Sequence, residues 1–143
     1  MISFDSININ LPQIDFEKII LWLDETAASF QKIIGKINYI FCDDAEILRI
    51  NRQFLNHDYF TDIITFDYSH KKRISGDIII SVETVSSNSK KYGESYENEL
   101  LRVIVHGVLH LCGIKDKTPE ERMEMERNEN TALQLWQKIS ELK

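Results

Sequence analysis

Residues 106–116 read HGVLHLCGIKD, and this stretch says more about the fold than any other. His106 and His110 are four residues apart, so on a helix their side chains project from one face and can meet at one point. Gly113 favours the left-handed conformation that ends many helices, after which the chain can turn back and bring Asp116 to the same point. The stretch therefore predicts a helix with a metal site whose ligands are His106, His110 and Asp116.

Two other interpretations of these histidines have to be weighed. A pair at this spacing on an apolar helix can be two buried core residues, but Gly113 and Asp116 at matching offsets favour a metal. The metal could also be purely structural, although structural zinc sites usually have four protein ligands that are rich in cysteine. Cys112 lies about 200° round the helix from His110, which predicts a core position rather than a ligand.

The ligand spacing equals that of the metzincin proteases, H-E-x-x-H-x-x-G-x-x-H/D. This chain has Gly107 where those proteases carry the glutamate that acts as general base. A hydrolase built on this site must therefore activate water mainly through the metal, since bound zinc lowers the pKa of water to about 7. We assign no catalytic group beyond the metal-bound water, and Gly107 makes a metzincin-like peptidase the less favoured hypothesis.

The composition is that of one globular domain spanning residues 1–143, with 43% hydrophobic and 28% charged residues. Two cysteines form no disulfide framework, the start of the chain does not resemble a signal peptide, and no apolar run is long enough to span a membrane, so we expect a cytoplasmic protein without membrane contact. The net charge of −6 argues against a protein that coats nucleic acid through bulk electrostatics. A local basic patch remains compatible with it, and the oligomeric state stays open.

Hydrophobic periodicity predicts the order β-α-β-α-β-β-α-α-α. The strands are expected at residues 2–9, 37–41, 61–68 and 76–82, and the helices at 15–33, 43–55, 83–92, 96–112 and 118–142. Gly35 is expected to cap the first helix, and TPEE at 118–121 is a capping box. We expect the acidic run from Glu120 to Glu129 to face solvent. The fold class is α+β: a small mixed sheet of about four strands, packed with about five helices that include a metzincin-like metal helix. The strand order is left open.

The stretch HGVLHLCG at residues 106–113 resembles the signature of the YbeY family, which are single-domain bacterial metallo-endoribonucleases linked to ribosomal RNA maturation. Other blocks of that family follow in the right order along most of the chain. They are NRQF at 51–54, Asp58, TDIITF at 61–66, GDIII at 76–80 and the helix segment 100–105 that leads into the histidines.

The resemblance implies hydrolysis of single-stranded RNA in 16S ribosomal RNA 3′-end maturation and ribosome quality control, with the ribosome or its small subunit as partner. It also implies zinc held by the signature residues, so His106 and His110 carry over directly as ligands. The usual third ligand is a histidine at the position of Asp116. Its carboxylate lowers the charge of the site by about one unit and makes another divalent metal more plausible.

A second departure from the family is Leu55, where an arginine thought to contact substrate phosphate is usual. Either Arg52, Arg73 or Lys72 binds phosphate in its place, or catalysis is weaker. The preferred hypothesis is therefore a zinc-dependent endoribonuclease, and the alternative is a non-catalytic ribosome-assembly factor stabilised by its metal. Asp62 is interpreted either as a partner of the metal site or as a strand cap.

Overall fold

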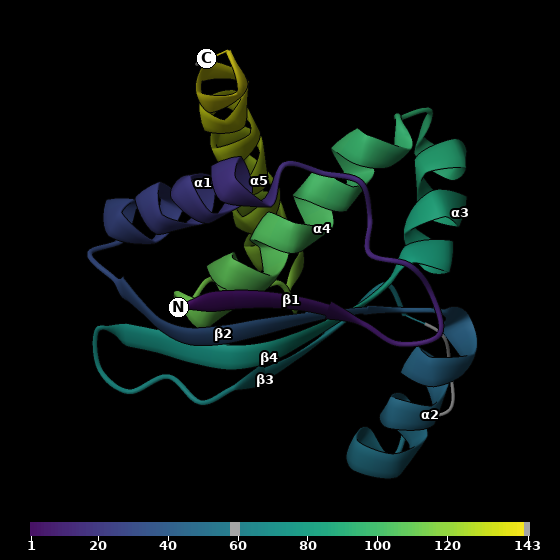
Figure 1. Cartoon of the computed structure of the whole chain (residues 1–143). Helices are drawn as coiled ribbons and strands as arrows, with labels where there is room; N and C mark the ends of the chain where they lie inside the picture. Colours follow the sequence, from purple (N-terminus) through teal and green to yellow (C-terminus); the bar gives the residue numbers. More distant parts are fainter. Residues whose placement is uncertain (58–60, 142–143) are drawn as a thin grey trace.

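The computed structural model describes residues 1–57 and 61–141. Its elements have the predicted order (Figure 1). They are β1 (Ile2–Ser6), α1 (Phe16–Ser29), β2 (Ile33–Cys42), α2 (Asp44–Leu55), β3 (Ile63–Asp67), β4 (Arg73–Ser81), α3 (Val82–Tyr92), α4 (Tyr96–Leu111) and α5 (Pro119–Ser140). The predicted α+β class with a four-stranded mixed sheet and five helices is confirmed for the described residues.

The strand order, which the sequence left open, is β1-β2-β4-β3. β2 pairs in parallel with both β1 and β4, whereas β3 runs antiparallel to β4 and forms an edge of the sheet. The short polar turn between β3 and β4 permits this antiparallel pair, while each parallel pair is joined through a helix. Within the described residues β3 has a strand neighbour on one side only, and its alternate residues Ile63, Thr65 and Asp67 help to line the site described below.

The two faces of the sheet are covered differently. In Figure 1, α1 and α4 lie over one face with α5 behind them, and α2 lies on the opposite side. Alternation along β2 explains the division: Ile37, Tyr39 and Phe41 point to the α1–α4 side, while Cys42 packs with Ile47 of α2. We call the α1–α4 side the inner face and the α2 side the outer face.

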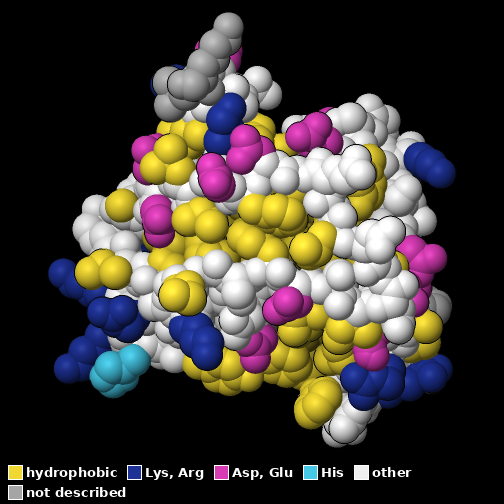
Figure 2. All heavy atoms as spheres, in the orientation of Figure 1, with side chains coloured by type: hydrophobic (Ala, Val, Ile, Leu, Met, Phe, Trp, Pro, Cys, Tyr) yellow, Lys and Arg dark blue, Asp and Glu magenta, His cyan; other side chains and the backbone are white. Residues whose placement is uncertain are grey.

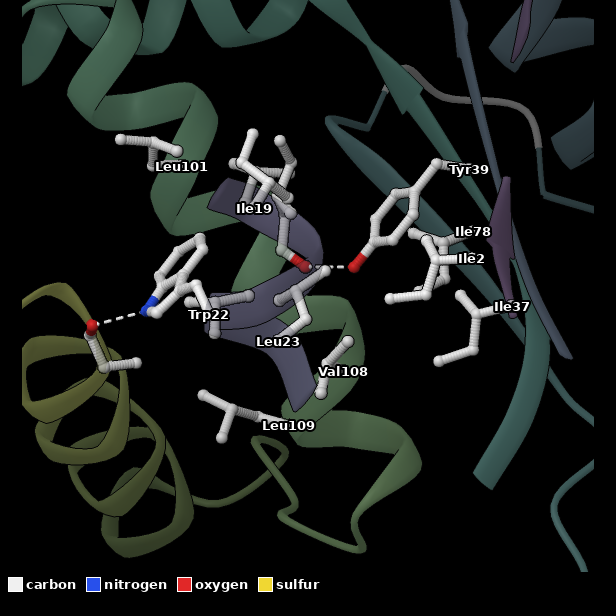
Figure 3. Close-up of a cluster of buried hydrophobic side chains, with 14 of the residues drawn as sticks. Ile2, Ile19, Trp22, Leu23, Ile37, Tyr39, Ile78, Leu101, Val108 and Leu109 are labelled. Carbon is white, nitrogen blue, oxygen red and sulfur yellow. Dashed lines mark hydrogen bonds between the residues drawn. The ribbon is translucent and has the colours of Figure 1, made fainter. Parts of the chain in front are cut away.

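Two buried polar groups tie the helices to the inner core (Figure 3). The indole Nε1 of Trp22 in α1 donates to the Ala132 carbonyl of α5 at 2.7 Å. The Tyr39 hydroxyl of β2 donates to the Ile104 carbonyl of α4, also at 2.7 Å. Since a buried donor without a partner is costly, these bonds favour one placement of α4 and α5 relative to the sheet.

The helix ends mostly follow their sequence signals. Thr118 caps α5 in the predicted capping box with Glu121. The expectation for Gly35 was wrong, because α1 ends at Ser29 and the chain turns at Gln31, whose φ is +58°. Gly35 instead lies in β2, where a Cβ atom would come within 2.5 Å of Ser75 Oγ. The predicted end of the last helix, Leu142, lies outside the described residues.

Both cysteines are buried free thiols, as expected from the absence of a disulfide framework. Burial raises the pKa of Cys42 to about 12 and that of Cys112 to about 11, so neither thiol is ionised near neutral pH. Cys112 packs in the inner core. None of the described helices combines the length and apolar character needed to cross a membrane.

Candidate metal centre

The three predicted ligands meet at the C-terminal end of α4. Helix α4 ends at Leu111, and Gly113 just after it has a φ of +98°, the left-handed conformation expected from the sequence. The loop that follows brings Asp116 Oδ2 to 3.1 Å from His110 Nε2 and 3.3 Å from His106 Nε2. One ligand atom from each of these residues lies within 4.8 Å of the others.

This geometry fits a bound divalent ion. Ligand atoms about 2.0–2.1 Å from a tetrahedral zinc ion lie about 3.4 Å from one another, close to the two separations measured from Asp116 Oδ2. Two imidazole nitrogens and one carboxylate oxygen suit zinc and several other divalent metals. Among the described residues this group has three members, so a bound ion would keep a coordination position open, as in catalytic rather than structural zinc sites.

Glu129 is a residue of the site that sequence reasoning missed. Its Oε2 lies 2.6 Å from His106 Nδ1, and its Oε1 accepts from Arg102 Nη1 at 2.9 Å. The acidic run of α5 was expected to face solvent, and for Glu129 this was wrong, since the residue is only 8% exposed. Glu129 lies four residues after Met125 and three before Ala132, which are both buried. This helical spacing puts Glu129 on the buried face of α5, and it is the sequence signal that could have identified the residue.

The carboxylates near His106 alter its protonation. Burial lowers the pKa of His106, but the hydrogen bond and charge of Glu129, with the charges of Asp116 and Asp62, outweigh this effect. The pKa of His106 is therefore raised above its ordinary 6.5. A histidine ligand must lose its proton to bind metal, so the site favours metal binding above this raised pKa.

The centre opens into a cleft of about 640 Å³ between edge strand β3 and helix α4. Side-chain exposures of 19% for His106, 29% for His110 and 33% for Asp116 show that the ligands are accessible from it. Its described wall residues are Thr61, Asp62, Ile63, Thr65, Asp67, Glu99, Arg102, Val103, His106, His110, Asp116 and Glu129. Carboxylates are thus prominent in the wall, which favours cations near the centre.

Asp62 and Glu99 are two of these wall carboxylates. Burial raises the pKa of both, and the charge of His106 partly opposes this for Asp62. The Asp62 carbonyl also accepts from the Ser81 amide at 2.9 Å, joining the start of β3 to the end of β4. The structure therefore places the Asp62 side chain in the cleft with the metal centre, whereas its backbone takes part in the sheet.

Gly107, which replaces the metzincin glutamate, is buried against the sheet. A Cβ atom there would lie 2.9 Å from Ile78 Cδ1 and 3.3 Å from Ile63 Cδ1. The absence of a side chain lets α4 approach β3 and β4 closely. A glutamate at this position would point into the sheet rather than into the cleft.

The candidate phosphate-binding residues lie outside the cleft wall. Arg52 is exposed on α2, on the outer face, and so is Leu55 at the end of that helix, while Asp58 lies outside the described residues. Lys72 is exposed in the β3–β4 turn and Arg73 at the start of β4, on the hairpin whose β3 strand lines the cleft. Figure 2 shows lysine and arginine side chains gathered at that end of the molecule.

The fold and the site define a class: small α+β proteins with a histidine–histidine–carboxylate centre beside a sheet-edge cleft. A family model described as Endoribonuclease YbeY matches residues 2–137. The chain belongs to this family.

Curated relatives named Endoribonuclease YbeY match nearly the whole chain. The protein from Phocaeicola vulgatus is 53% identical over 135 residues, covering 94% of this chain and 98% of the relative. The one from Bacteroides thetaiotaomicron is 49% identical over 132 residues, covering 92% and 96%. A solution structure from Thermotoga maritima has the same fold, with a TM-score of 0.67 and 23% identity over 96% of this chain and 93% of that one.

Proposed function

We propose that this protein is a metal-dependent endoribonuclease specific for single-stranded RNA, acting in the cytoplasm in 16S ribosomal RNA 3′-end maturation and ribosome quality control. The observation that carries the proposal is the convergence of His106, His110 and Asp116 on one wall of an accessible cleft. Family membership supports it, since the relatives bear the name endoribonuclease. The ribosome or its small subunit is the corresponding partner.

The ligand set indicates the chemistry. His106 and His110 would hold the ion through Nε2 and Asp116 through Oδ2. When bound, a divalent ion can polarise a phosphate oxygen and generate a nucleophile from water at neutral pH. Zinc is the proposed ion, and the carboxylate of Asp116 makes another divalent metal the alternative.

The cleft suits a flexible single strand better than a duplex. Its wall is rich in carboxylates, so phosphates are attracted mainly where a bound cation offsets that charge. A single strand can bend to place one phosphodiester at the centre while its neighbours lie outside, whereas a duplex is stiff. Lys72 and Arg73 on the hairpin tip, and Arg52 on α2, would hold flanking phosphates outside the cleft.

The test combines metal content with cleavage of a single-stranded ribosomal RNA fragment. We expect about one divalent ion per chain and cleavage by the purified protein. His106→Ala should lose both metal and cleavage. The matched control is His70→Ala, because His70 is exposed on the β3–β4 turn outside the cleft and should retain both. Equal cleavage by His106→Ala and the unaltered protein would trace the activity to a contaminating nuclease and overturn the proposal.

A non-catalytic, metal-stabilised assembly factor is the second candidate, and the charge of the cleft favours it. Arg102 is the one lysine or arginine among the described wall residues, and Glu129 and Asn130 already bind it. Leu55 also replaces the usual arginine of the family. Unfolding on chelation, with no turnover of any RNA, would support this candidate.

The peptidase hypothesis is disfavoured by the packing of Gly107, and casein digestion with added zinc would test it.

A further inference from the structure

We propose that Glu129, held by Arg102, is a positioning residue that orients His106 toward the metal. The inference rests on the metal centre of the proposed function. Three contacts link α4 to α5 at this point: His106 Nδ1 to Glu129 Oε2 at 2.6 Å, Arg102 Nη1 to Glu129 Oε1 at 2.9 Å, and Arg102 Nη2 to Asn130 Oδ1 at 2.8 Å.

The first contact selects one form of the His106 ring. An ionised carboxylate can only accept hydrogen bonds, so Nδ1 of His106 must be the donor. In neutral imidazole the lone pair is then on Nε2, the nitrogen that faces Asp116 Oδ2 at 3.3 Å. Such a carboxylate–histidine pair fixes both the tautomer and the orientation of a metal ligand.

The second contact occupies the remaining oxygen of Glu129. Arg102 binds Oε1, and the same guanidinium is anchored to Asn130, so rotation of the carboxylate would break a charged hydrogen bond. Glu129 is also only 8% exposed. Arg102 and Asn130 therefore fix the orientation in which Glu129 contacts His106 Nδ1.

The two histidines differ in this respect. Within the described part of the chain, His110 has a carboxylate contact through Nε2 alone, to Asp116, and its side chain is more exposed than that of His106. The structure thus makes His106 the pre-oriented ligand. Loss of Glu129 should affect the tautomer of His106 and leave that of His110 unchanged.

The experiment measures metal affinity by competition with a chelator, and histidine tautomers by nitrogen-15 NMR. Glu129→Ala should weaken zinc binding about 10- to 100-fold and remove the preference of His106 for a proton on Nδ1. Glu129→Gln keeps an oxygen that can accept from Nδ1, so it should retain the tautomer and recover much of the affinity. Glu126→Ala, at an exposed glutamate of the same helix, is the matched control and should bind as the unaltered protein does.

Arg102→Met tests the second part of the proposal. It frees Glu129 Oε1 without touching the metal ligands, and we expect an affinity loss between those of Glu129→Gln and Glu129→Ala. The preference of His106 for a proton on Nδ1 should also weaken in the nitrogen-15 spectra. Affinity within twofold of the unaltered protein, with an unchanged His106 tautomer, would overturn the role of Arg102.

The outcomes separate this inference from the proposed function. Denaturation curves identify any variant that fails to fold, and Glu129→Gln keeps nearly the same shape if Glu129→Ala does fail. A Glu129→Ala protein that binds zinc within twofold of the unaltered protein, or that keeps the Nδ1-protonated form of His106, overturns the positioning role alone. Failure of the unaltered protein to bind any divalent metal overturns the proposed function itself.

Discussion

The two faces of the sheet differ in the size of the hydrophobic cluster that each buries and in what they carry. The inner face is covered by α1 and α4 and holds the large core cluster that continues into α5. On the outer face, α2 covers the smaller cluster of Cys42, Ile47, Ile50, Ile64 and Ile79. Two of the three candidate ligands, His106 and His110, stand on α4, which packs on the inner face, and Asp116 stands on the loop that follows. Ligand geometry has to hold within about 0.5 Å, and a densely packed scaffold provides such precision.

The largest effect is expected from Gly107→Glu, which restores the metzincin glutamate. Its side chain would meet Ile78 and Ile63 and would bury a charge against the sheet. We expect a loss of unfolding free energy above about 5 kcal/mol, by overpacking together with an unpaired buried carboxylate. Denaturant titration followed by circular dichroism measures it.

Gly107→Ala is the matched control for that change. One methyl group would lie 2.9 Å from Ile78 Cδ1, 3.0 Å from Ile78 Cγ2 and 3.3 Å from Ile63 Cδ1. This is overpacking by a single carbon without a buried charge, so the cost should be about 1–3 kcal/mol. A Gly107→Glu protein with unaltered stability would show that α4 does not depend on close approach to the sheet.

The next effect compares neighbouring isoleucines of β4 that point to opposite faces. Ile78 lies in the inner cluster and Ile79 in the outer one, and both are buried. Ile78→Ala should cost about 3–5 kcal/mol and Ile79→Ala about 2–3 kcal/mol, because the smaller cluster can collapse more easily around the cavity. Ile78→Ala should also weaken metal binding, since Ile78 supports Gly107. Equal losses of unfolding free energy for Ile78→Ala and Ile79→Ala would show that the two clusters respond alike to a cavity.

Removal of the metal should have a smaller effect on stability. A ligand at 100 times its dissociation constant stabilises the fold by about 2.7 kcal/mol, and the inner core should keep the metal-free protein folded. Thermal denaturation with and without chelator measures this difference.

The pKa of His106 is raised, so protons compete for the site from a higher pH than with an ordinary histidine. Below that pKa the apparent metal affinity should fall by about tenfold per pH unit, as chelator competition at a series of pH values would show.

The sequence predicts correctly those features that depend on residues close together in the chain. Helix periodicity, the capping box at Thr118 and the spacing of His106, His110 and Gly113 all act within a few residues, and the structure has them as predicted. The α+β class followed from the order of such elements. Gly35 shows the limit of this reasoning, because its role depends on Ser75 in a neighbouring strand rather than on the helix before it.

The remaining features depend on contacts between distant segments. The antiparallel placement of β3 at the sheet edge creates the cleft, yet no short pattern specifies strand order. Glu129 contacts His106, which is 23 positions away in the sequence. Because Glu129 belongs to an acidic run, the sequence predicted that it would face solvent. A carboxylate that falls on the apolar stripe of an amphipathic helix is the sign that would have identified it.

The smallest effect concerns the polar part of the outer face. Asn38 of β2 donates through Nδ2 to Asp77 Oδ1 at 3.0 Å and accepts from Ser3 Oγ at 2.5 Å, so these side chains link three adjacent strands. Asn38→Ala should cost about 0.5–1.5 kcal/mol, since partly buried hydrogen bonds contribute modestly. A double-mutant cycle with Ser3→Ala isolates one of the bonds and should give a coupling of about 0.5–1 kcal/mol. Metal affinity should be unchanged in all three variants, because the metal centre is supported from the inner face. A parallel loss of metal affinity would show that the outer face also holds the site in place.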